Sequence, residues 1–115
     1  EPVDGAGGPG ARASGASLGA RVVASPRMSG QRAFVRRGPD DASVAALIDA
    51  LARAGGRLTI TEAARAVGEP PVRMSRYLTQ VARLLNVDGY AVLRVTDEGR
   101  TVEQNTRLLT EQFAV

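Results

Sequence analysis

The stretch EPPVRMSRYLTQVARLLN, residues 69–86, decides the fold of this 115-residue chain. Its two prolines suit the first turn of a helix, because proline has a fixed φ and no N–H to leave unpaired. The apolar residues that follow recur at helical spacing and predict one buried face: Met74, Tyr77, Leu78, Val81, Leu84 and Leu85. We therefore expect a helix from Pro70 to about Leu85 whose other side is exposed and carries arginines.

The residues from 40 to 56, DDASVAALIDALARAGG, predict an earlier amphipathic helix. Asp40 is of the residue type that caps a helix N-terminus, and Gly55-Gly56 are of the type that ends one. The apolar stripe of this helix follows the spacing i, i+3, i+4, i+7: Val44, Leu47, Ile48 and Leu51.

A second, shorter helix is predicted between these two. The stretch RLTI, residues 57–60, reads as a short extended segment, and Thr61 is then expected to cap the helix EAARAV. Gly68 stops that helix. The corner from Gly68 to Pro70 has the length and glycine content of a helix-turn-helix, so the three helices together predict that motif.

The next segments predict a β-hairpin. YAVLRVT, residues 90–96, alternates and is rich in β-branched residues, DEGR at 97–100 has the composition of a hairpin loop, and TVEQ at 101–104 is the returning strand. Helix, short strand, helix, tight turn, helix, strand, loop, strand is the order of a winged helix. The fold prediction is therefore a mainly α winged helix-turn-helix with a small β-hairpin.

The C-terminal stretch NTRLLTEQF, residues 105–113, predicts a short helix capped by Asn105 or Thr106. Its inward-facing residues are expected to be Leu108, Leu109 and Phe113. The winged-helix domain is placed at residues 39–115. Its predicted core comprises Leu47, Ile48, Leu51, Leu58, Leu78, Val81, Leu85 and Leu93.

The N-terminal residues have a different composition. Residues 1–24 are rich in glycine, proline and alanine and are expected to form a flexible linker, with a larger part of the protein upstream. Residues 25–38 predict a short helix or ordered arm ended by Gly38-Pro39. Its N-cap, its first-turn proline and its apolar anchors are Ser25, Pro26, Met28, Phe34 and Val35.

The positive charge lies mainly in the N-terminal third. All fifteen basic residues are arginine, which either favours phosphate binding or reflects GC-rich coding. Residues 1–37 carry a net charge of +4, whereas residues 38–115 hold nine arginines against ten acids, a net −1. We expect Arg32, Arg36 and Arg37 to give a basic tail whose binding to duplex DNA is weak and indifferent to sequence.

The composition excludes several classes of function. The chain has no cysteine and no histidine, so disulfides, zinc fingers and Cys or His catalysis are ruled out. The adjacent acids Asp40-Asp41 and Asp97-Glu98 are more simply a helix cap and a turn, and GAGGPG lacks the Lys-Ser/Thr of a phosphate loop. The expectation is a cytoplasmic, non-catalytic domain with no cofactor, metal or membrane segment.

The candidate contact surface is the polar side of the 70–85 helix. Five residues form it: Arg73, Arg76, Thr79, Gln80 and Arg83. In helix-turn-helix proteins the N-terminal half of this helix supplies base contacts, and arginine can bridge guanine as glutamine can bridge adenine. The alternatives are a solvated helix face or a surface for a protein partner. An acidic wing tip, Asp97-Glu98, argues against DNA, because its carboxylates would repel phosphates.

Three stretches resemble the C-terminal domain of PglZ, the alkaline-phosphatase-like component of phage growth limitation (type-2 BREX) systems. They are VVASP…QRAFVRR, LLNVDGYAVLRV and LLTEQF, within a similarity over about residues 20–115 that is most specific at Leu84–Val95 and Leu108–Phe113. The resemblance implies a bacterial antiphage protein with its phosphatase-like domain upstream. It also implies an accessory role for this segment within a multi-protein defence complex.

Two functional hypotheses follow. The first is a winged helix used as a protein-docking module for other components of the antiphage complex, with weak duplex DNA contact and a homodimer left open. The second is a winged helix that reads duplex DNA through Arg73, Arg76 and Gln80. The near-neutral folded part and the acidic wing favour docking, whereas the arginine side of the helix and the basic tail favour DNA.

Overall fold

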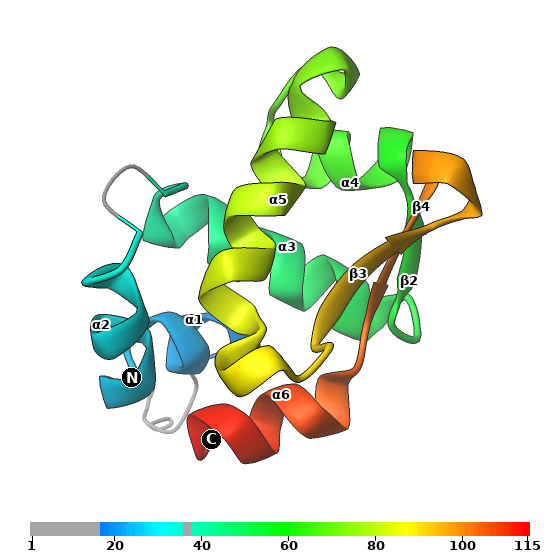
Figure 1. The fold of residues 1–115 in the computed structure, drawn as a ribbon. Coiled ribbons are helices and arrows are strands. Elements are labelled where there is room, and N and C mark those ends of the chain that lie inside the picture. The colour runs from blue at the N-terminus through cyan, green and yellow to red at the C-terminus, as the bar shows by residue number, and fades with distance from the viewer. Residues whose placement is uncertain (1–16, 36–37) are drawn as a thin grey trace, which may run out of the picture.

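The computed structural model describes residues 17–35 and 38–115, and the following elements are those of these two ranges (Figure 1). Its α-helices are α1 (Leu18–Val23), α2 (Pro26–Arg32), α3 (Asp41–Arg53), α4 (Ile60–Val67), α5 (Met74–Leu85) and α6 (Thr106–Phe113). Its strands are β2 (Arg57–Thr59), β3 (Leu93–Thr96) and β4 (Thr101–Gln104). Single 3₁₀ turns occupy Pro71–Arg73, Val87–Gly89 and Asp97–Gly99. The fold is therefore mainly helical with a small sheet.

The sheet is antiparallel and has three strands in the order β2-β4-β3. Its register pairs Leu58 of β2 and Val95 of β3 with the same residue of the central strand, Val102. The predicted hairpin is joined by the predicted short extended segment, of which Arg57–Thr59 form β2 while Ile60 begins α4. In Figure 1 the sheet lies beside α5, and α3 passes behind α5.

The core is continuous and follows the predicted faces. All six apolar residues of the 70–85 helix are buried, as predicted, together with the stripe of α3. Of the eight predicted core residues, Leu58 is only partly buried. Leu58 lies on β2, a three-residue strand at the edge of the sheet, which has a neighbouring strand on one side only.

Helix α4 begins two residues earlier than predicted. Thr59, rather than Thr61, is the N-cap, and it forms a reciprocal capping box with Glu62. The Glu62 N–H donates to Thr59 Oγ1 (3.1 Å), and the Thr59 N–H donates to Glu62 Oε1 (3.0 Å). The Thr61 prediction is wrong because a glutamate three residues on selects Thr59. At α6 the choice falls on Asn105, whose Oδ1 accepts the Leu108 N–H (3.0 Å).

The predicted linker is wrong for its last residues, because Leu18–Val23 form helix α1 and pack on α3. Gly19 permits this contact: a Cβ there would lie 2.2 Å from the Ala45 carbonyl oxygen. The Gly19 N–H donates to Asp49 Oδ1 of α3 (2.8 Å), and Val22 is fully buried. The domain boundary at residue 39 is also too late, since α1 and α2 share the core. Residues 1–16 lie outside the described ranges.

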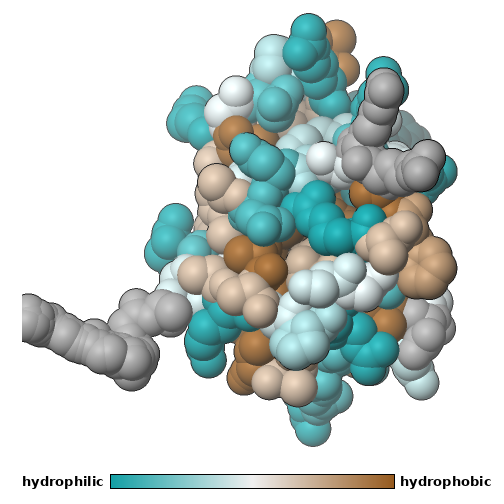
Figure 2. Space-filling model, turned by 90° about the vertical axis from the view of Figure 1, so that its left-hand side faces the viewer, coloured by the Kyte–Doolittle hydropathy of each residue, from teal (hydrophilic) through white to brown (hydrophobic). Residues whose placement is uncertain are grey.

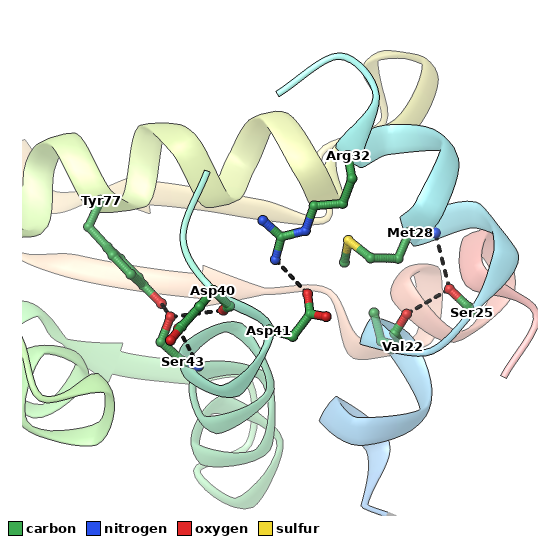
Figure 3. Close-up of polar contacts among 8 residues, drawn as sticks. All are labelled: Val22, Ser25, Met28, Arg32, Asp40, Asp41, Ser43 and Tyr77. Carbon is green, nitrogen blue, oxygen red and sulfur yellow. Dashed lines mark hydrogen bonds and ion pairs between the residues drawn. The ribbon is translucent and has the colours of Figure 1, made fainter. Parts of the chain in front are cut away.

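Helix α2 confirms the arm predicted from residue 25 and shortens it. Ser25 caps the helix, whose last residue is Arg32 rather than one next to Gly38-Pro39. Met28 is buried as predicted, but Phe34 is 84% exposed, so its anchoring role is wrong. Arg32 Nη2 joins α2 to α3 through Asp41 Oδ1 at 2.6 Å (Figure 3).

Candidate interface on helix α5

The five predicted contact residues share the outer side of α5 and its first turn. Pro70 has extended backbone (φ −63°, ψ 140°), and a 3₁₀ turn carrying Arg73 leads into the α-helix. The burial of the opposite side fixes which residues face outward. Four of the five are exposed and Gln80 is half-buried: Arg73, Arg76, Thr79 and Arg83 are the exposed ones.

The arginines of this surface are unpaired among the described residues. Ion pairs elsewhere in the described ranges engage other arginines, and none reaches Arg73, Arg76 or Arg83. Thr79 uses its hydroxyl locally, because Oγ1 donates to the Ser75 carbonyl (2.9 Å). The guanidinium groups are therefore the available donors on this side of the helix.

An open groove of about 900 Å³ runs between the N-terminal parts of α3 and α5. Arg73, Arg76 and Gln80 line one wall, while Asp40 and Glu69 contribute carboxylates. We call it the α3–α5 groove. It brings Arg73 and Arg76 next to Asp40, which is far away in the sequence, and next to Glu69, which directly precedes Pro70. The surface is consequently mixed in charge.

The polar contacts inside this groove are fixed by α3. The Tyr77 hydroxyl donates to Ser43 Oγ (2.9 Å), and the Ser43 N–H donates to Asp40 Oδ1 (3.0 Å), as Figure 3 shows. Hydrogen bonding by the hydroxyl and then by the N–H of Ser43 lowers the pKa of Asp40. Burial raises the pKa of the Tyr77 phenol, which therefore stays protonated at neutral pH. Asp40 remains a carboxylate at the rim of the groove.

The turn between β3 and β4 carries exposed acids, at the place predicted for the hairpin loop. Asp97 and Glu98 both adopt positive φ (52° and 55°) and point away from the core. Asp97 is held by the Thr101 hydroxyl (2.8 Å) and lies 3.6 Å from Arg57 Nη2. Two negative side chains therefore stand at the end of the hairpin.

A second groove, of about 450 Å³, lies between α5 and the outermost strand β3. It is lined by Leu78, Thr79, Ala82, Arg83, Asn86, Leu93, Arg94 and Val95. We call it the α5–β3 groove. Asn86 and Val95 were missed by the sequence reasoning, since alternation in 90–96 does not tell which edge of the strand stays open.

Of the three arginines predicted for the basic tail, the structure describes one, Arg32. Arg32 lies on α2 and is engaged by Asp41, so it belongs to the folded part rather than to a free tail. Arg36 and Arg37 lie outside the described residues. Figure 2 shows hydrophilic and hydrophobic residues interspersed on the face of the molecule that lies to the left in Figure 1.

Within residues 17–35 and 38–115, no group of three or more Asp or Glu side chains is arranged to hold a metal ion. A search of the same residues for a helix long and apolar enough to cross a bilayer found none.

Comparison with known proteins gives the family. The family model described as the BREX system PglZ C-terminal domain matches residues 13–114. Comparison with curated proteins and with solved structures gave no match. The matched region contains every described helix and strand, including α1, which the sequence pattern had assigned to a linker. This chain belongs to the BREX system PglZ C-terminal domain family.

Proposed function

We propose that this domain is a non-catalytic winged helix that docks its PglZ protein onto another component of the BREX system. The element order α3-β2-α4-α5-β3-β4 and the sheet order β2-β4-β3 support the winged-helix assignment. Family membership supports a role among BREX components, and the family description assigns this segment to the C-terminal part of PglZ rather than to its phosphatase-like part.

The observation that carries the docking proposal is the arrangement of charge around α5. The exposed arginines are flanked on one side by Asp40 and Glu69 of the α3–α5 groove. At the far end of the hairpin stand Asp97 and Glu98. A duplex laid along α5 would bring its phosphates toward these carboxylates, whereas a protein partner can place cations opposite them.

The charge of the segment that carries α5 supports the same conclusion. Affinity for duplex DNA comes largely from phosphate neutralisation by Lys and Arg. Residues 38–115, which carry α5 and the hairpin, have a net charge of −1, and the excess of arginines lies in residues 17–37, outside these elements. We therefore expect duplex contact by this domain to be weak.

The second candidate function is duplex recognition through α5. It is favoured by the absence of a carboxylate partner, among the described residues, for Arg73 and Arg76. A free guanidinium can fork onto guanine O6 and N7, and each such contact contributes about 1–3 kcal/mol of base discrimination. Gln80 stands one turn further along the same side.

A pulldown separates the two candidates. The tagged chain would be co-expressed with the other BREX components, captured with and without nuclease, and compared with Arg73→Ala/Arg76→Ala. Docking predicts that a BREX component is captured equally with and without nuclease, and loss of that capture in Arg73→Ala/Arg76→Ala would place the contact at the α3–α5 groove. Arg53→Ala/Arg107→Ala is the matched control, because both of its arginines are exposed and neither lies on α5.

Capture that disappears on nuclease treatment would contradict docking and support duplex recognition. Capture of nothing by the unmodified chain would contradict docking as well.

A further inference from the structure

The outer edge of β3 is open at one residue. In an antiparallel ladder, successive residues direct their N–H and C=O groups alternately toward the neighbouring strand and away from it. The Asn105 N–H donates to the Val92 carbonyl (2.8 Å), which makes Val92 inward-facing and Leu93 outward-facing. By the same alternation, the N–H and C=O of Val95 point outward.

The two outward-facing residues differ in their partners. The Asn86 side chain bonds both groups of Leu93: the Leu93 N–H donates to Oδ1 (2.8 Å), and Nδ2 donates to the Leu93 carbonyl (3.0 Å). An amide side chain thus takes the place of a neighbouring strand there. Across residues 17–35 and 38–115, no such partner meets the outward groups of Val95. Asn86 also shows that this edge faces the end of α5.

The side chain of Val95 is incompletely covered, although it lies on the inner face of the sheet. Val95 is directly opposite the buried Val102, and residues directly opposite in a ladder point to one face. Yet Val95 is 44% exposed, and it lines the α5–β3 groove. With Leu78, Ala82 and Leu93 it forms an apolar floor in the α5–β3 groove.

The charge of the groove has one sign. Arg83 stands on the α5 wall and Arg94 on the β3 wall, and no acidic residue is found among the described side chains that line the groove. Arg94 shares Glu103 with Arg57, while Arg83 has no carboxylate partner among the side chains that the structure describes, which do not include that of Asp88. An occupant with an apolar side chain for the floor and carboxylates for the walls matches these features.

We propose that the α5–β3 groove binds an extended acidic segment of a protein partner, which adds to β3 as an antiparallel strand opposite Val95. This rests on the proposed docking function and names the chemistry of what is docked. Strand addition uses main-chain hydrogen bonds for affinity and alternate side chains for specificity. The residue opposite Val95 would place an apolar side chain on the floor. Its acidic neighbours would point to the other face of the sheet, the side of Arg94, and Arg83 on the α5 wall would add a second attractive charge.

The test uses a seven-residue peptide of alternating valine and glutamate, titrated into the whole chain by NMR. Two matched peptides accompany it: one with lysine in place of glutamate, and one N-methylated at its valines, which cannot donate to β3. We expect the acidic peptide to bind, and the two matched peptides to bind much more weakly or not at all. We also expect the Val95 amide to become protected from hydrogen exchange, while the Leu93 amide, held by Asn86, is protected throughout.

Variants of the chain locate the site. Val95→Pro removes an outward donor without breaking the β3–β4 ladder, and should weaken peptide binding about three- to tenfold, the effect of one hydrogen bond. Arg83→Glu should weaken it by a similar factor or more. Val72→Ser is the control, because Val72 is 88% exposed but lies outside this groove. The thermal melt of each variant shows whether it is folded.

The outcomes are distinct. No binding of the acidic peptide, equal binding of the lysine peptide, or binding that Val95→Pro leaves unchanged would overturn the edge-strand proposal. Competition by duplex DNA with the same sensitivity to Val95→Pro would overturn it in favour of nucleic acid. If a BREX component is captured equally by Val95→Pro, docking stands and the edge strand fails. If the peptide binds but the unmodified chain captures no component, docking fails and the edge strand stands.

Discussion

Gly19 is the single residue on which the attachment of the N-terminal helix depends. Its missing Cβ lets α1 approach the backbone of α3 at Ala45, and its N–H is bonded by Asp49. We predict that Gly19→Ala destabilises the domain by about 1–3 kcal/mol, the usual cost of overpacking a close contact. Urea unfolding of the purified chain measures this directly.

Gly30 supplies the matched control. It lies within α2, and a Cβ built there meets nothing within 4 Å. Gly30→Ala should therefore be neutral or stabilise by up to about 1 kcal/mol, since alanine is the better helix former. Equal stability of the Gly19→Ala variant and the parent would show that α1 does not pack on α3.

Asp40 and Glu62 make the helix N-termini of α3 and α4 sensitive to acid. Hydrogen bonds from Ser43 lower the pKa of Asp40 below 3.8, and those from Thr59 lower the pKa of Glu62 below 4.5. A carboxyl whose pKa is lowered on folding stabilises above its unfolded pKa, and loses this contribution as pH falls through its folded value. The affected window therefore begins near pH 4.5 and extends below 3.8.

We predict that Asp40→Asn/Glu62→Gln flattens this dependence. Asparagine caps helices as well as aspartate, and glutamine can replace glutamate in a capping box, so the variant should melt close to the parent at pH 7. Between pH 5 and 3 the melting temperature of the parent should fall more steeply than that of the variant. Parallel curves over this range would contradict the assignment of these two carboxyls.

At the scale of elements, α5 was the most predictable part of the molecule. Its strong amphipathic pattern is local, so the buried and exposed sides could both be assigned from spacing. Helix α1 could not, because LGARVV is only six residues long and its fit depends on a glycine that meets a distant carbonyl. The start of α4 was missed by two residues because two threonines competed and Glu62 decided between them.

The candidate site was predictable only in part for the same reason. The arginine side of α5 follows from helical spacing. The position of Asp40 does not, since this residue reaches the groove through the tertiary packing of α3 rather than through sequence proximity. Nor does the open edge at Val95, because strand order in a sheet depends on which segments meet in space.

The inner side of α5 gives a direct test of the fold. Leu78 is almost fully buried, so Leu78→Asp would bury an unpaired charge and should abolish the cooperative thermal transition. Leu78→Ala should cost about 2–5 kcal/mol. Thr79 is the next residue and is exposed, so Thr79→Asp should keep a cooperative melt. A cooperative melt of Leu78→Asp near the parent temperature would refute the packing of this helix.

At the scale of the whole molecule, the continuous core changes how DNA affinity has to be assigned. Deleting residues 1–37 would remove the basic tail but also α1 and α2, with the buried Val22 and Met28. Arg12→Gln/Arg36→Gln/Arg37→Gln removes three positive charges of the tail and leaves both helices. We predict that this variant loses most of the weak duplex binding of the parent.

Fluorescence anisotropy against salt measures that loss. Each phosphate neutralised contributes about −0.9 to the slope of log affinity against log salt, so the slope should become shallower in the variant. Arg73→Ala/Arg76→Ala in the intact chain should change little. Micromolar or tighter binding at physiological salt that depends on Arg73 and Arg76 would instead make α5 a duplex-reading helix.

The contact between α2 and α6 also bears on how the domain is made. Arg27 Nε donates to the Gln112 carbonyl (3.3 Å), 85 residues along the chain, and Phe113 is buried near the end of α6. Contacts between such distant residues form slowly, because the loop between them has to close first. When the ribosome has translated α1 to α5, helix α6, which packs against α2, has therefore not yet been made. We expect the nascent domain to reach its final packing only after α6 has left the exit tunnel, and until then the side of α2 that packs on α6 is open to chaperones.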